Sequence, residues 1–280
     1  MGAWIIAGIT FREAARKKVL WMAFLAGLAF LSLFGTGLYF QLKDLSPHSS
    51  PLIYRQGVSA LLMVGLYAVD IMAVVMSVLV SVDTLSGELA SGTIQAVATK
   101  PIARWEVLLG KWLGFAGMVT AYVALMVGGI TGITYGLSVH RVGGVLPHHL
   151  LEGAGLIWLE CILMLGLTFR LGASFSTMTN GVLALGLHGV AFVGGWIEQA
   201  AALTHSPRAL NVGIVASLIM PSEALWRRAA FEMQSPLVSA LGFSPFSAAS
   251  VPSRLMIVYA GLYMAAALAL AVRRFSQRDL

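Results

Sequence analysis

Long apolar stretches alternate with short polar ones along this chain of 280 residues. A stretch of about 20 apolar residues is long enough to cross the hydrocarbon core of a bilayer as an α-helix. Six stretches reach this length and predict membrane spans, at residues 19–40, 56–82, 107–137, 151–173, 181–203 and 254–274. The pattern therefore predicts an all-α polytopic membrane protein with about six transmembrane helices.

The most polar break in this pattern lies between the second and the third apolar stretch. Within it, Ile94, Val97 and Ala98 have the spacing of one helix face. Pro101 ends this pattern, because proline cannot continue a helix. A new helix is expected to begin near Arg104 and to run into the third span. The break thus predicts a short surface helix held between two membrane helices, where another protein can dock.

The first 18 residues also have an amphipathic pattern. Trp4 and Phe11 share one helical face, and Arg12 and Arg16 lie on another. A helix with this distribution is typical of the membrane interface. We therefore expect residues 1–18 to form an interfacial segment on the inner side.

A second amphipathic helix is predicted at residues 221–233. Ser222 is suited to cap its N-terminus, and Leu225, Ala229 and Met233 share a face, with the charged residues turned away. We expect this helix to lie on the outer leaflet as a lid or an interfacial anchor. A solvated loop helix without a function is the alternative interpretation.

The remaining connections predict no further domain. The helix just described belongs to an outer connection at residues 204–253, whose first part, residues 204–220, contains Pro, Ser and His and predicts ordinary turns. We find no internal repeat and no low-complexity linker in the sequence. The chain is therefore interpreted as a single transmembrane domain over residues 1–280.

Composition agrees with a membrane protein and excludes an ordinary soluble enzyme. Charged residues make up 11% of the chain, against about 25% in soluble domains, and hydrophobic residues make up 58%. The formal charge of +6 is explained by Lys and Arg near lipid headgroups rather than by a nucleic-acid partner. The single cysteine, Cys161, excludes an intrachain disulfide.

The distribution of Lys and Arg predicts the orientation. With the N-terminus inside, eleven of these residues lie on the cytoplasmic side and seven on the outer side. The positive-inside rule then places both termini in the cytoplasm. The polar break at residues 83–106 also faces the cytoplasm in this arrangement.

The polar break resembles a known family. The pattern E-x3-G-T-I-x5-K-P-I-x-R-x5-G-K, and an N-terminal Phe11-Arg12-Glu13-Ala14 followed by Arg16-Lys17-Lys18, are similar to permease subunits of ABC-type transporters of the second, export-type class. The similarity covers residues 10–40 and 83–115. It implies a permease of an ATP-driven exporter in a prokaryotic inner membrane, which pairs with itself or with a related permease.

The resemblance also implies how the permease receives energy. ATP and Mg would be bound by separate ABC ATPase subunits, so no cofactor and no catalytic residue are expected in this chain. The contact with the ATPase is implied to involve Glu88, Gly92, Thr93, Lys100, Pro101, Arg104, Glu106, Gly110 and Lys111. A solvated loop whose basic residues follow the positive-inside rule is the alternative for this segment.

Three ionisable residues lie inside the predicted spans, where such residues are costly and usually face protein or water. They are Asp70, Glu160 and His188. Glu160 and His188 lie on consecutive antiparallel spans at similar depth and are therefore able to pair. A structural pair that fixes helix packing and a polar lining of a transport route are the two interpretations.

Other function classes have less support. A stand-alone channel, a secondary carrier or a membrane-embedded enzyme built on Asp70, Glu160 and His188 are the alternatives to a permease. We find no Walker loop, no nucleophile motif and no array of Cys or His with metal-ligand spacing. Gly128, Gly132 and Gly136 form a bare stripe that predicts close helix packing, within the subunit or across a dimer.

Overall fold

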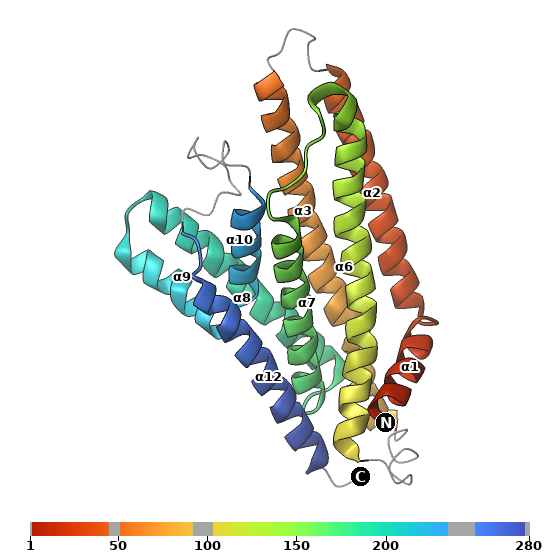
Figure 1. Cartoon of the computed structure of the whole chain (residues 1–280). Coiled ribbons are helices and arrows are strands. Elements are labelled where there is room, and N and C mark those ends of the chain that lie inside the picture. Colours follow the sequence, from red (N-terminus) through yellow and green to blue (C-terminus); the bar gives the residue numbers. More distant parts are fainter. Residues whose placement is uncertain (1, 45–50, 92–102, 235–249, 278–280) are drawn as a thin grey trace.

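The computed structural model describes residues 2–44, 51–91, 103–234 and 250–277. The elements of this described part are helices, without strands (Figure 1). Their bounds are α1 Gly2–Ala14, α2 Lys18–Asp44, α3 Pro51–Ser81, α4 Thr84–Ser91, α6 Arg104–Val142, α7 Leu150–Gly172, α8 Thr177–Leu203, α9 Pro207–Ile219, α10 Ser222–Met233 and α12 Arg254–Ser276.

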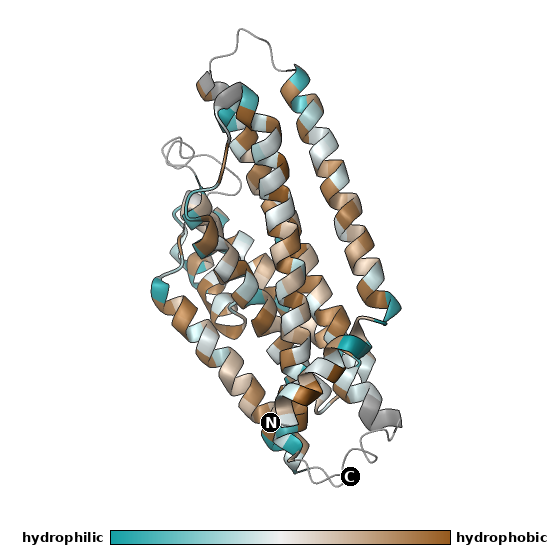
Figure 2. Ribbon diagram, turned by 45° about the vertical axis from the view of Figure 1, so that its right-hand side comes forward, coloured by the Kyte–Doolittle hydropathy of each residue, from teal (hydrophilic) through white to brown (hydrophobic). Residues whose placement is uncertain are grey.

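The all-α polytopic fold is confirmed. Six described helices are long and apolar enough to cross a membrane, namely α2, α3, α6, α7, α8 and α12. Hydrophobic residues follow these helices along their length, and hydrophilic residues gather mostly near helix ends (Figure 2). α1 and the end of α12 lie at the same end of the bundle, which we name the terminal end, and the opposite end is the far end (Figure 1).

α7 forms the centre of the bundle. It packs against α3, α6, α8, α10 and α12, and every residue from Glu160 to Phe169 is buried. α2 and α12 lie at the periphery, with most of their surface exposed. A helix segment buried on all sides must be enclosed by other helices, and residues 160–169 of α7 meet this condition, whereas Leu151 near its start is exposed.

The sequence-based prediction of turns at residues 204–220 is wrong. The structure has the helix α9 there, which packs along α8. Ser206 and Pro207 mark its start, because proline suits the first position of a helix. The same proline is equally compatible with a turn, which is why the sequence pattern predicts one here. α9 and α10 meet at an angle of 106° and form either a broken span or a re-entrant hairpin.

α6 is longer than one membrane crossing requires. Its 39 residues rise by about 58 Å, against about 30 Å for the hydrocarbon core. At the far end lies a small separate apolar cluster of Leu38 and Leu42 from α2, Tyr54 and Val58 from α3, and Val145 from the connection after α6, and Leu137 of α6 packs against it. These helices are therefore held together by a core of their own at the far end.

α1 packs against the start of α6 through small residues. A Cβ atom at Gly110 would lie 2.7 Å from the Ala3 carbonyl oxygen, and one at Gly114 would lie 2.8 Å from that of Ala7. Glycines spaced by four residues allow two helices to approach this closely. Trp4 of α1 stays exposed.

This packing predicts that Gly114→Ala destabilises the protein by about 1–3 kcal/mol, because the new methyl group collides with the α1 main chain. Gly117→Ala is the matched control on the same helix, since its methyl group meets only the Phe11 ring, at an ordinary contact distance of 3.8 Å. The control is expected to be neutral or to stabilise by about 1 kcal/mol through helix propensity. Thermal unfolding in detergent measures both. Equal effects of the two substitutions would show that α1 does not pack here.

Candidate functional site

The terminal end joins the start of α6 to two other helices. The Arg104 guanidinium donates a hydrogen bond of 3.2 Å to the Ser276 carbonyl, at the last residue of α12. The Glu106 carboxylate lies against Gly2, at the N-terminus of α1, where the helix dipole favours a negative charge. Gly110 lies in close contact with the α1 main chain, as described above. These predicted ATPase-contact residues therefore hold helix ends together.

The junction between α3 and α4 is fixed to the turn between α7 and α8. The Thr177 hydroxyl donates to the Asp83 carboxylate at 3.0 Å and lies 2.8 Å from the Ser86 hydroxyl. The Asn180 amide donates at 3.1 Å to the carbonyls of both Val82 and Thr168. The start of α4 thus cannot move without the ends of α7 and α8.

The remaining predicted contact residues are placed only in part. Glu88 lies in α4, and Lys111 lies on α6 near Glu13 and Thr84. Gly92, Thr93, Lys100 and Pro101 lie outside the described residues, as does the short helix predicted from Ile94, Val97 and Ala98. α4 ends at Ser91 and α6 begins at Arg104, so both flanks of this segment lie at the terminal end.

The three intramembrane residues meet in the centre of the bundle. Glu160 Oε1 lies 3.8 Å from His188 Nδ1, and the Asp70 and Glu160 carboxyl groups are close enough to interact. Glu160 is completely buried, and Asp70 is 2% exposed. The structure also adds Glu223 of α10, which interacts with both carboxyl groups. Three carboxyl groups from three helices therefore interact with one another away from solvent.

The predicted position of residues 221–233 at a surface is wrong. α10 is buried between α7, α8 and α12, and its charged residues are not turned outward. Arg227 is 2% exposed and pairs with Glu198 of α8 at 2.9 Å. Ser222 does not cap the helix but lies 3.0 Å from His188 Nδ1. A low-hydrophobicity helix was interpreted as interfacial because the sequence did not reveal its buried partners.

The Glu198–Arg227 ion pair connects four parts of the chain. Arg227 also donates to the Ser217 hydroxyl of α9 at 3.0 Å, and the Ser250 hydroxyl donates to Glu198 at 2.6 Å. Gly213 of α9 lies directly against Glu198, which places α9 in close contact with α8. The ion pair thus holds the hairpin of α9 and α10 to α8.

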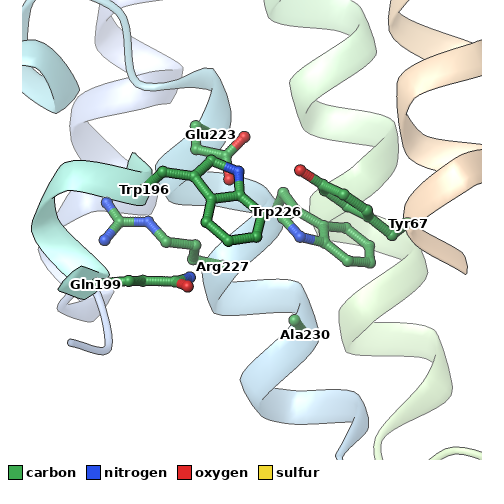
Figure 3. A pocket seen from close by; sticks show the side chains of 7 residues that line it. All are labelled: Tyr67, Trp196, Gln199, Glu223, Trp226, Arg227 and Ala230. Carbon is green, nitrogen blue, oxygen red and sulfur yellow. The ribbon is translucent and has the colours of Figure 1, made fainter. Parts of the chain in front are cut away.

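A small pocket lies beside this ion pair (Figure 3). It is lined by Tyr67, Trp196, Gln199, Glu223, Trp226, Arg227 and Ala230, and its volume is about 10 Å³. This is close to the minimum that accommodates one water molecule. The Tyr67 and Trp226 rings face each other with centroids 5.0 Å apart. The pocket in this conformation is therefore too small for a transported molecule.

The comparison with protein families gives one match over nearly the whole chain. The model described as "ABC-2 family transporter protein" covers residues 4–280. The chain belongs to the ABC-2 family. It is accordingly an integral membrane protein and a permease subunit of an ABC transporter, and the family implies an ABC ATPase as a partner in general. The comparison with curated proteins gives no match.

Three buried charged residues of the ABC-2 permease, Glu198, Glu223 and Arg227, are not predicted from its sequence. The amphipathic pattern places Glu223 and Arg227 on a helix at the outer leaflet, with their charges turned away from the apolar face, and so does not predict their burial. Glu198 lies inside the apolar stretch 181–203 and was the one available signal. A carboxylate inside a span requires a partner, and a search for that partner would have led to the Arg residues of α10.

The ion pair in the ABC-2 permease predicts a large effect of removing one charge. Glu198→Gln removes the carboxylate that pairs directly with the buried Arg227 and is expected to destabilise the protein by about 3–5 kcal/mol. Glu198→Gln combined with Arg227→Met removes both charges and is expected to recover most of that loss. Thermal unfolding of the three proteins in detergent gives the comparison. A double variant as unstable as the single one would contradict the role assigned to the pair.

Proposed function

We propose that this permease belongs to an ATP-driven exporter in which separate ATPase subunits bind ATP and Mg. The segment that joins α4 to α6 is proposed to contact the ATPase. Both termini then face the cytoplasm of a prokaryotic cell, and the protein lies in the inner membrane. The chain itself contributes no cofactor site and no catalytic residue in this proposal.

The observation that carries this proposal is the connectivity of the terminal end. The segment begins after α4, which is fixed to the start of α8 through Ser86 and Thr177. It ends at α6, which is fixed to α12 through Arg104 and to α1 through Gly110. A force applied between Ser91 and Arg104 is therefore transmitted to five helices that span or flank the membrane, namely α1, α6, α7, α8 and α12. A mechanical coupling element needs such rigid local contacts.

The ATPase contact is tested by charge reversal in the segment. Glu88→Lys and Lys100→Glu are each expected to reduce co-purification with the ATPase and its stimulation by the permease by about tenfold, which corresponds to about 1.4 kcal/mol. Arg104 is less suitable, because its reversal also breaks the hydrogen bond to Ser276.

Glu152→Lys is the matched control, since Glu152 is exposed at the start of α7, remote from the terminal end. It is expected to leave both measurements unchanged. If neither segment variant weakens binding while all three proteins remain folded, another part of the permease contacts the ATPase.

The permease is further proposed to work as a dimer with a second copy or a related permease. The stripe of Gly128, Gly132 and Gly136 on α6 is unused within the subunit, because an added Cβ would meet nothing within 4 Å. Gly136 also borders an open apolar groove between α2 and α6, with a volume of about 710 Å³. Small residues on an exposed helix face allow close approach of another helix.

Disulfide cross-linking tests this interface. Cys161 is the only cysteine and is completely buried, so an introduced cysteine has no competitor. Gly132→Cys is expected to give a covalent dimer on mild oxidation in membranes. Gly186→Cys, on an open face of α8, is expected to remain monomeric. If only the α8 variant forms a covalent dimer, the dimer interface includes α8 and not α6.

A further inference from the structure

Three carboxyl groups form an isolated acidic site inside the bundle. Asp70 comes from α3, Glu160 from α7 and Glu223 from α10, and each of the three pairs interacts electrostatically. Their exposed fractions are 2%, 0% and 4%. We name these three residues the acidic trio. Three negative charges in such a site would repel one another without screening by water.

The neighbours of the trio do not supply matching positive charge. The ionisable groups that face it are Tyr67 of α3, Cys161 of α7, His188 of α8 and Arg227 of α10. Arg227 is engaged by Glu198 of α8. On α12, Tyr259 and Tyr263 interact with each other. Among the described residues, His188 is a further cationic candidate, and it contacts Glu160 at 3.8 Å and Ser222 at 3.0 Å.

Unpartnered oxygen atoms point to a missing ligand. Both carboxyl oxygens of Glu160, and Oδ1 of Asp70, are buried without a hydrogen bond of ordinary geometry in the described structure. The Asp70 side chain and the Trp226 main-chain N–H approach Glu160 without completing such a bond. Buried polar atoms are nearly always satisfied, so these oxygens call for a bound donor.

The size and geometry of the site indicate which kind of hydrogen-bond donor it can bind. Among the described residues, no three His, Cys, Asp or Glu side chains converge in an arrangement suited to a metal ion. The adjoining pocket, beside Glu223, has a volume of about 10 Å³ and excludes an organic cation. A proton has no such requirement for space, and a shared proton joins two carboxyl groups that cannot both be ionised.

We propose that the acidic trio is an intramembrane proton-binding site. The proton comes from solvent and converts one carboxylate into a carboxylic acid, which then donates a hydrogen bond to its neighbour. Proton loading holds Glu223, and with it α10, against α3 and α7. Loss of the proton leaves adjacent unscreened charges and loosens α10. The site is independent of the ATPase contact, so its test does not require the ATPase.

Infrared spectroscopy tests proton occupancy directly. The full-length permease in lipid nanodiscs at neutral pH is expected to show the carbonyl band of a protonated carboxylic acid, because exposed carboxyl groups are ionised at this pH. Asp70→Asn, Glu160→Gln and Glu223→Gln are expected to reduce or remove this band. Glu152→Gln, which changes an exposed carboxyl on α7, is expected to leave it intact.

A wild-type protein without this band, or a band unchanged in all three trio variants, would overturn the proposal. Size-exclusion chromatography selects the variants that remain folded. The three substitutions lie on three different helices. If none of the three variants folds, the spectrum of the wild-type protein still tests the site.

Tryptophan fluorescence tests the link to α10. Trp196 and Trp226 line the pocket beside Glu223, so their emission reports movement of α10 (Figure 3). Raising the pH is expected to change the emission of the wild type. This transition is expected to be lost in Glu223→Gln and to become smaller in Trp226→Phe, in which Trp196 remains as a reporter. Replacing Na⁺ by K⁺ or choline at constant ionic strength is expected to leave the midpoint unchanged. A midpoint that follows the metal cation instead of the pH would refute the assignment to protons.

Discussion

A polar helix remains inside a membrane bundle only when other helices neutralise its charges, and α10 depends on this condition. Its Arg227 is buried and takes its counter-charge from Glu198 of α8, together with a hydroxyl from Ser217 of α9. A buried charge without a partner costs several kcal/mol. The positions of α8, α9 and α10 are therefore mutually dependent. Because α10 also packs on α7, the ion pair connects this hairpin to the central helix of the bundle.

The terminal end is organised by a different principle. Its contacts are hydrogen bonds and close main-chain approaches among helix ends, and they connect α4 and α6 to α1, α7, α8 and α12. The residues that resemble the family pattern, such as Arg104 and Gly110, take part in these contacts. The family pattern thus includes residues with an internal structural role, and this role does not conflict with a contact to an ATPase.

The sequence predicted the six spans because uninterrupted apolar stretches leave the chain no other way to satisfy its main-chain hydrogen bonds in lipid. It also predicted the start of α6 after Pro101 and the proximity of Glu160 to His188.

It did not predict α9, because Pro207 is compatible with both a turn and a helix start. It placed α10 at a surface, because an amphipathic pattern does not distinguish a polar face in water from one whose charges are paired inside protein. Pairings such as Glu198 with Arg227 depend on which helices become neighbours. The local pattern of hydrophobic and polar residues does not determine this.

The continuity of α6 has a geometric consequence. The helix begins at Arg104, passes the whole apolar core and ends beside the separate far-end cluster, with no proline between its ends. A straight rod of about 58 Å that pivots at its base by about 5° displaces its tip by about 5 Å. A rotation too small to disturb the packing around the pivot would thus be magnified into a movement as wide as one helical turn.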